Sequence, residues 1–128
     1  MEQIRVLIAD NSRDFARLFS RCLSINPDIQ IVGIAQNGSE TIQMLQLTDP
    51  DVLLLDLVMP FMDGFEVLRR LEPIDTKPLV YVISALGSEE MTRQAIALGA
   101  RYYFVKPLNT DMVISKIREA KLSAKYSN

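Results

Sequence analysis

The sequence has 128 residues, of which 48% are hydrophobic and 23% are charged, and its formal net charge is −2. These values are typical of one globular domain of the commonest size, about 100–150 residues. No apolar run reaches the roughly 18 residues of a membrane span, and the first residues lack the pattern of a secretory signal. We therefore expect a soluble, cytoplasmic domain without a membrane partner.

Two residue counts exclude several kinds of chemistry. With one cysteine and no histidine, the sequence excludes an internal disulfide, a zinc cluster and mechanisms that use imidazole as a general base. It also excludes a role for this chain as a phosphohistidine carrier. The slight excess of acidic residues, without a basic run, argues against nucleic-acid binding by this domain itself.

Five short apolar runs alternate with five segments of helical periodicity. The runs are rich in β-branched and aromatic residues and mostly do not alternate with polar ones, which predicts strands buried on both faces of a parallel sheet. In chain order we expect strands at 4–9, 29–35, 52–55, 79–83 and 102–105. The intervening segments predict helices near 13–23, 39–47, 64–71, 88–98 and 110–122, the first with an inward stripe of Phe15, Leu18, Phe19, Cys22 and Leu23.

This alternation predicts a doubly wound α/β domain with right-handed crossovers. The natural strand order for a small sheet of this kind is the flavodoxin-like 2-1-3-4-5. In that order the ligand crevice lies at the carboxyl ends of the first and third strands.

Polar residues follow four of the five expected strands. Asp10 and Asn11 follow the first strand, Asp56 the third, Ser84 the fourth and Lys106 the fifth. Two neighbouring carboxylates repel each other unless a cation lies between them, and a hard cation with oxygen ligands, such as Mg²⁺, is the common solution. A lysine and a short hydroxyl can approach phosphate oxygens, and a carboxylate can act as a nucleophile toward a phosphoryl donor. The set therefore predicts phosphoryl chemistry without imidazole.

The ordered set of motifs resembles the receiver domain of two-component response regulators over essentially the whole chain. The resemblance is carried by Asp10, the run DVLLLDLVMP at 51–60, Asp63-Gly64, Ser84-Ala85 and Lys106-Pro107. It implies a CheY-like fold and a cis peptide at Lys106-Pro107. It further implies that Asp56 is the phosphoacceptor, that Mg²⁺ is held by Asp10, Asn11, Asp56 and the Val58 carbonyl, and that the phosphoryl group is bound by Ser84, the Ala85 amide and Lys106.

One residue departs from the family pattern. The family usually has a second acidic residue where this chain has Asn11. Asparagine keeps a carbonyl oxygen but loses a negative charge, so we predict weaker Mg²⁺ binding and slower phosphorylation, without loss of the site.

The resemblance also implies a switch made of Ser84 and Tyr103. If Ser84 moves toward a phosphoryl group on Asp56, the aromatic ring of Tyr103 can swing inward. The output surface would then be the fourth helix, fifth strand and fifth helix, and we expect it to form a homodimer on phosphorylation. The residues alone leave open that Tyr103 is an aromatic at the sheet edge with its hydroxyl group in water.

A narrower similarity concerns the segments IADNSRDF, VGIAQNG and PDVLLLDLVMPFMDG, which resemble the response regulators that initiate sporulation in endospore-forming Gram-positive bacteria. It implies a partner protein that donates phosphate from phosphohistidine, and an output in transcription. We expect residues 1–128 to be a receiver fragment that lacks a DNA-binding effector domain, through which any contact with nucleic acid would occur. The domain would not be an enzyme, apart from promoting its own phosphorylation and dephosphorylation.

Two other classes remain open. A phosphatase or phosphotransferase with an aspartate nucleophile usually has Asp-x-Asp after one strand, whereas Asp56 is followed two positions later by Val58. A flavodoxin-like binding module needs a hydroxyl- and glycine-rich phosphate loop after its first strand, where this chain has the acidic sequence DNSR.

Overall fold

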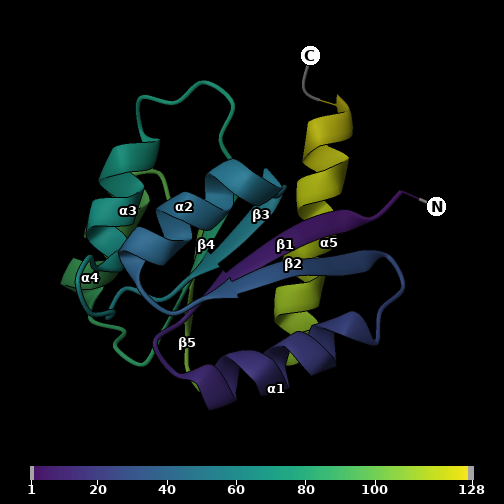
Figure 1. Ribbon diagram of the computed structural model, residues 1–128, viewed down its shortest axis with the longest axis horizontal. Coiled ribbons are helices and arrows are strands. Elements are labelled where there is room, and N and C mark those ends of the chain that lie inside the picture. The colour runs from purple at the N-terminus through teal and green to yellow at the C-terminus, as the bar shows by residue number, and fades with distance from the viewer. Residues whose placement is uncertain (1, 127–128) are drawn as a thin grey trace.

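The computed structural model describes the backbone of residues 2–126 and the side chains as far as residue 120. Strands and helices alternate along the chain (Figure 1), as the sequence predicts. The strands are β1 (Ile4–Ala9), β2 (Ile29–Ala35), β3 (Val52–Leu55), β4 (Leu79–Ser84) and β5 (Tyr102–Val105). The helices are α1 (Arg13–Ser24), α2 (Gly38–Thr48), α3 (Gly64–Leu71), α4 (Glu89–Ala97) and α5 (Thr110–Tyr126).

The five strands form one parallel sheet in the order β2-β1-β3-β4-β5, which confirms the predicted fold class and strand order. In the register of the central pair, Ala9 of β1 lies beside Leu55 of β3. Asp10 and Asp56 are the first residues after these two strands, so both leave the sheet at the same point. This register brings together two carboxylates that are 46 positions apart in the sequence.

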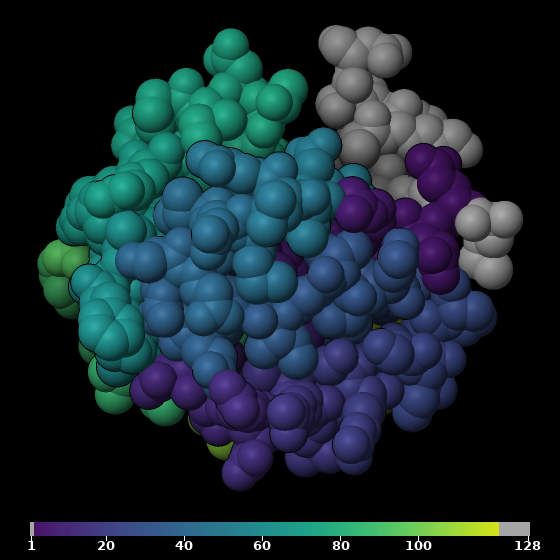
Figure 2. Space-filling view, in the orientation of Figure 1, coloured from purple at the N-terminus to yellow at the C-terminus, as the bar shows by residue number. Residues whose placement is uncertain are grey.

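Helices cover both faces of the sheet. One hydrophobic cluster joins α1 and α5 to one face through residues such as Phe19, Leu23 and Ile117. A second cluster joins α2, α3 and α4 to the other face, with Val67 and Leu68 among its buried members. Figure 2 shows how α2 and its neighbours fill the centre of one side of the molecule. The sheet thus forms the middle of three layers and leaves its carboxyl edge free for polar side chains.

Several details of burial differ from the prediction. The strands were expected to be buried on both faces, but β2 and β5 form the edges of the sheet and are largely half-buried. On α1, Leu18 was expected in the inward stripe and is instead 63% exposed, while Ala16 is buried. Cys22 is half-buried. The predicted stripe was based on large hydrophobic side chains, so it did not include the small Ala16, which is fully buried in the core.

Capping residues explain where four helices begin. Ser12, Asn37, Asp63 and Ser88 each accept a hydrogen bond from the backbone N–H three positions later. Such caps satisfy N–H groups that have no partner inside the helix. Gly99, directly after the C-cap residue of α4, has a φ of 110°, which favours glycine. The last helix continues beyond its predicted end at Leu122 to Tyr126.

None of the helices in the described part of the chain is long and apolar enough to cross a membrane.

Candidate functional site

The carboxyl ends of β1, β3, β4 and β5 bring the predicted polar residues to one edge of the sheet. Backbone hydrogen bonds continue the sheet just past the strand ends: the Asp56 N–H donates to Ala9 over 2.8 Å, and the Lys106 N–H donates to Ser84 over 2.8 Å. Asp10, Asp56 and Ser84 are all buried. The backbone thus positions the first atoms of these side chains before any side-chain contact is made.

Lys106 reaches from the end of β5 to the end of β1. Its Nζ lies 2.7 Å from Oδ2 of Asp10, and the Asp10 side chain is only 1% exposed. The other oxygen of Asp10 accepts the backbone N–H of Ser12 over 2.8 Å. Both oxygens of this buried carboxylate are therefore hydrogen-bonded, one to a charge and one to the main chain.

Asp56 has weaker compensation for its charge. Its Oδ1 accepts the backbone N–H of Val58 over 3.2 Å. Burial raises the pKa of the Asp56 carboxyl above its ordinary value, and the negative charge of Asp10 raises the pKa further, while the Val58 N–H, the charge of Lys106 and the Asn11 N–H oppose these effects. The local pair of carboxylates has one ammonium group for two negative charges, so the site favours an additional positive charge.

The donor atoms present fit a hard divalent cation. Two carboxylates, Asp10 and Asp56, meet at the edge of the sheet, and Asn11 and Val58 follow them directly in the chain. Among the described residues, no group of three or more His, Cys, Asp or Glu side chains could hold a metal. That finding agrees with an amide in place of a carboxylate at Asn11, whose side chain is exposed. Oxygen ligands of this kind suit Mg²⁺, which retains several water molecules.

Ser84 and Tyr103 both hydrogen-bond to the backbone of Leu86, one to its N–H and one to its carbonyl oxygen. The Ser84 Oγ accepts the backbone N–H of Leu86 over 3.1 Å. The Tyr103 hydroxyl donates to the carbonyl oxygen of Leu86. The Tyr103 hydroxyl is thus bonded to the β4–α4 loop, and the two residues predicted to form a switch are connected through Leu86. Ala85, which lies between Ser84 and Leu86 in the sequence, is exposed.

The remaining predicted feature of the site, the peptide bond between Lys106 and Pro107, is cis. The sequence analysis did not single out two neighbours of the site, Leu86 and Phe15. The ring centroid of Phe15 lies 4.1 Å from the Nζ of Lys106. Its position in the apolar stripe of α1 predicted that Phe15 faces inward, but no local pattern pointed to a lysine 91 positions later.

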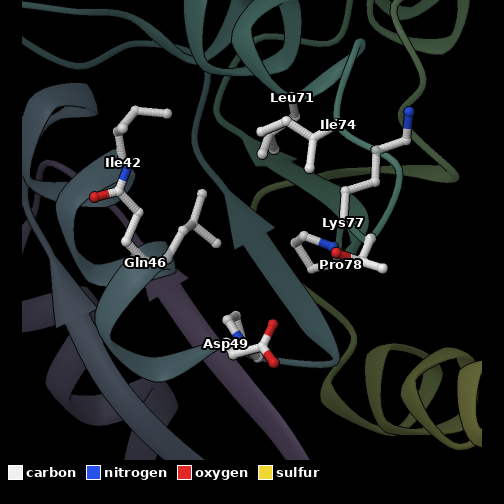
Figure 3. Close-up of a pocket in the computed structure, with 10 residues that line it drawn as sticks. Ile42, Gln46, Asp49, Leu71, Ile74, Lys77 and Pro78 are labelled. Carbon is white, nitrogen blue, oxygen red and sulfur yellow. The ribbon is translucent and has the colours of Figure 1, made fainter.

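An apolar groove of about 360 Å³ lies elsewhere on the molecule (Figure 3). It is lined by Ile42 of α2, by Leu71 at the end of α3 and by Ile74 in the loop that follows α3. Asp49 and Pro78, which also line it, come before β3 and β4, whereas the acidic residues follow the strands. The groove therefore lies at the opposite edge of the sheet and contributes nothing to the candidate site.

Comparisons with known proteins agree on one family. The sequence matches the response regulator receiver domain over residues 6–118. The chain is similar to the receiver domain of the putative response regulator NarL from Mycobacterium tuberculosis, with 29% identity over 94% of this chain and 98% of that one, and a TM-score of 0.89. It is also similar to the response regulator domain of CheB from Thermotoga maritima, with 25% identity over 99% of this chain and 100% of that one, and a TM-score of 0.83.

A third similar structure is the receiver domain of the DNA-binding response regulator merR from Colwellia psychrerythraea 34H. It is 28% identical over 94% of this chain and 99% of that one, with a TM-score of 0.85. The match to the family spans the sheet, the acidic edge and the lysine that reaches it. With its predicted strand order and its paired carboxylates in place, the chain belongs to the response regulator receiver domain family.

Proposed function

We propose that this domain is a signalling switch in which Asp56 is the residue that accepts a phosphoryl group. The observation that carries the proposal is the arrangement of charge: two buried carboxylates, Asp10 and Asp56, share a single ammonium group, which lies on Asp10. This pairing leaves the Asp56 carboxylate as the less compensated of the two. A phosphoryl donor protein carrying phosphohistidine, such as a histidine kinase or a phosphorelay protein, is the proposed partner.

The transfer exchanges one bond to phosphorus for another. A carboxylate oxygen of Asp56 forms the new bond as the bond between phosphorus and the imidazole nitrogen of the donor breaks. Lys106, Ser84 and the Ala85 amide bind the phosphoryl oxygens in this proposal, for which the lysine gives up part of its contact with Asp10. Positioning and charge balance supply most of the catalysis in phosphoryl transfer.

Mg²⁺ is the proposed cofactor, held by Asp10, Asp56, Asn11 and the Val58 carbonyl. When bound, it neutralises the charge that builds up on the transferring phosphoryl oxygens. Asp10 is oriented for this role by the Ser12 N–H, which fixes one of its oxygens.

The proposed output is a change in the α4–β5–α5 face. Phosphorylation adds up to about two negative charges and three acceptor oxygens near Ser84, whose hydroxyl now accepts the Leu86 N–H. If Ser84 turns toward the phosphoryl group, the backbone of Leu86 loses one of its two side-chain partners and the loop that leads into α4 rearranges. Four exposed apolar side chains lie on or beside this face and support dimerisation there: Leu86, Ile96, Val105 and Met112.

The narrower proposal is that the switch regulates transcription, and in particular the start of sporulation. The segments IADNSRDF and VGIAQNG carry the similarity to the sporulation regulators. The similar merR protein is described as a DNA-binding response regulator. We propose a DNA-binding effector as the partner of this domain in the same pathway.

Intact mass spectrometry tests the central proposal. Native chain and Asp56→Asn are incubated with acetyl phosphate, with Mg²⁺ or with EDTA. We expect the mass of one phosphoryl group to be added to the native chain with Mg²⁺, and no addition to Asp56→Asn, which preserves the size of the side chain. Equal labelling of both proteins would contradict the assignment. Steady turnover of a small phosphoester would instead favour an enzyme, whereas we propose that the domain acts only on its own aspartate.

A further inference from the structure

The ammonium group of Lys106 has two close contacts. Asp10 Oδ2 lies 2.7 Å from Nζ, and the centroid of the Phe15 ring lies 4.1 Å from Nζ. The negative face of an aromatic ring attracts a cation at this distance. The lysine side chain is only 21% exposed, so water competes weakly with both contacts.

The Phe15 ring is itself fixed in place. Its backbone N–H donates to Oγ of Ser12, the N-cap of α1, over 3.2 Å. Its ring stacks on Phe19 with 5.4 Å between centroids and 22° between planes, and Phe19 is buried in the core. The N–H of the same Ser12 donates to Asp10. The same short segment of chain therefore fixes both the carboxylate and the ring that the ammonium contacts.

We propose that Phe15 is a positioning residue for Lys106, which holds the ammonium on Asp10 in the unphosphorylated state and so makes it compete with a divalent cation for that carboxylate. The proposal rests on the proposed role of Asp10 in binding Mg²⁺. One Asp10 oxygen is engaged by the Ser12 N–H, and the ammonium approaches the other. A divalent cation that binds there must displace the ammonium or share the oxygen with it. Every contact that stabilises the ammonium on Asp10 therefore lowers the affinity of the site for the cation. Phe15 thereby sets how readily the site takes up Mg²⁺.

Substitutions of Phe15 can distinguish the effect of its aromatic ring from the effect of its size. Phe15→Leu and Phe15→Met keep a large apolar side chain but remove the ring, whereas Phe15→Tyr keeps the ring. Phe65→Leu is a matched control, because Phe65 is also a half-buried phenylalanine on a helix, but it packs in the cluster on the other face of the sheet. A general loss of packing would affect all of the leucine variants, and the proposed effect is confined to Phe15.

The first measurement needs no metal. In NMR spectra of the metal-free protein, the ring current of Phe15 should shift the ε-methylene protons of Lys106 upfield. We expect this shift in the native chain, Phe15→Tyr and Phe65→Leu, and its loss in Phe15→Leu and Phe15→Met. An unchanged lysine shift in both ring-deleted variants would overturn the proposal.

The second measurement is the Mg²⁺ affinity, followed by amide shifts near Asp56 during titration with MgCl₂. We expect Phe15→Leu and Phe15→Met to bind Mg²⁺ about two- to fivefold more tightly than the native chain, the scale of one partly exposed cation–π contact. Phe15→Tyr and Phe65→Leu should bind like the native chain. The proposal would be overturned if both ring-deleted variants bound Mg²⁺ no more tightly than the native chain. It would also be overturned if none of the proteins bound Mg²⁺.

Phosphorylation of the native chain by acetyl phosphate distinguishes failure of the Phe15 proposal from failure of the proposed function. Labelling of Asp56 together with an unchanged Mg²⁺ affinity in the Phe15 variants refutes only the role of Phe15. Failure of labelling refutes the proposed function, whereas the lysine shift in the metal-free protein still reports whether Phe15 positions Lys106.

Discussion

Asp56, the proposed phosphoacceptor, is a residue whose charge lowers the stability of the fold. Burial and the neighbouring Asp10 raise the pKa of its carboxyl group above the ordinary value of 3.8. A raised pKa means that the folded protein binds the proton more tightly than the unfolded chain does. The ionised carboxylate therefore lowers the free energy of unfolding as the pH rises from 3.8 through the pKa of the folded state, and the cost is fully present above that pKa.

Asp56→Asn should remove this cost. We expect the variant to raise the free energy of unfolding at pH 7 by about 1 kcal/mol, a typical value for one buried polar group. The gain should shrink as the pH falls through the raised pKa of the folded state, and it should vanish below the ordinary value of 3.8, where the native carboxyl group is protonated in both the folded and the unfolded states. Urea unfolding in EDTA at several pH values measures both effects. A variant that is less stable than the native chain at pH 7 would show that the carboxylate is better compensated than its surroundings indicate.

Asn11 offers the converse experiment, in which a charge is restored. Asn11→Asp adds a third carboxylate beside Asp10 and Asp56, so electrostatic attraction for a divalent cation increases. We expect Mg²⁺ to bind about tenfold more tightly, equivalent to about 1.4 kcal/mol, because the exposed position screens much of the added charge. Calorimetric titration with MgCl₂ compares the two proteins, and Asn11→Ser controls for loss of the amide. Equal affinities of native chain and Asn11→Asp would refute the prediction.

At the scale of elements, the start of α3 is tied closely to the end of β3. The Gly64 N–H donates to the carbonyl of Leu57 over 3.0 Å. A Cβ atom placed on Gly64 would lie 2.5 Å from the Asp56 carbonyl oxygen and 2.8 Å from the Leu57 Cα. Glycine is needed here because a helix begins in contact with a backbone, and that contact fixes the segment that carries Asp56.

Gly64→Ala should therefore push α3 away from the segment that follows β3 and carries Asp56. We expect a loss of about 2–3 kcal/mol in the free energy of unfolding, since the clash is with backbone that cannot rotate away. Labelling by acetyl phosphate should also slow, because the Asp56 carbonyl belongs to the displaced segment. Thermal unfolding and intact mass measure the two effects. A fully stable variant would show that the loop relaxes without cost.

The elements also show what a sequence can and cannot predict. Strand positions and order followed from apolar runs and alternation, because buried parallel strands leave a strong local signal. The paired carboxylates followed too, since residues after parallel strands share one edge. The exposure of Leu18 and the contact between Phe15 and Lys106 could not be predicted, because both depend on how α1 packs against distant segments.

At the scale of the whole molecule, the acidic edge and the α4–β5–α5 face are joined by the β4–α4 loop. Ser84 at the site and Tyr103 at the face both bond to Leu86. On that face Ile96, Val105 and Met112 are each between 45% and 49% exposed. Exposed apolar side chains on these three elements favour an interaction surface, and a second copy of the chain can bury them symmetrically.

Val105→Glu should block dimerisation without affecting phosphorylation, since the side chain of Val105 is 47% exposed while the backbone of β5 continues to position Lys106. Sedimentation velocity of the native chain should show its 14.5 kDa mass double when beryllofluoride mimics the phosphoryl group, while Val105→Glu stays monomeric. A buried charge of this kind opposes association strongly because it would lie unpaired in the interface.

Leu47→Glu is the matched control, because Leu47 is 79% exposed on α2, away from the face, and this variant should dimerise like the native chain. If Val105→Glu dimerises as well as Leu47→Glu, or if the native chain stays monomeric with the mimic, the signal leaves the domain by a route other than association through this face.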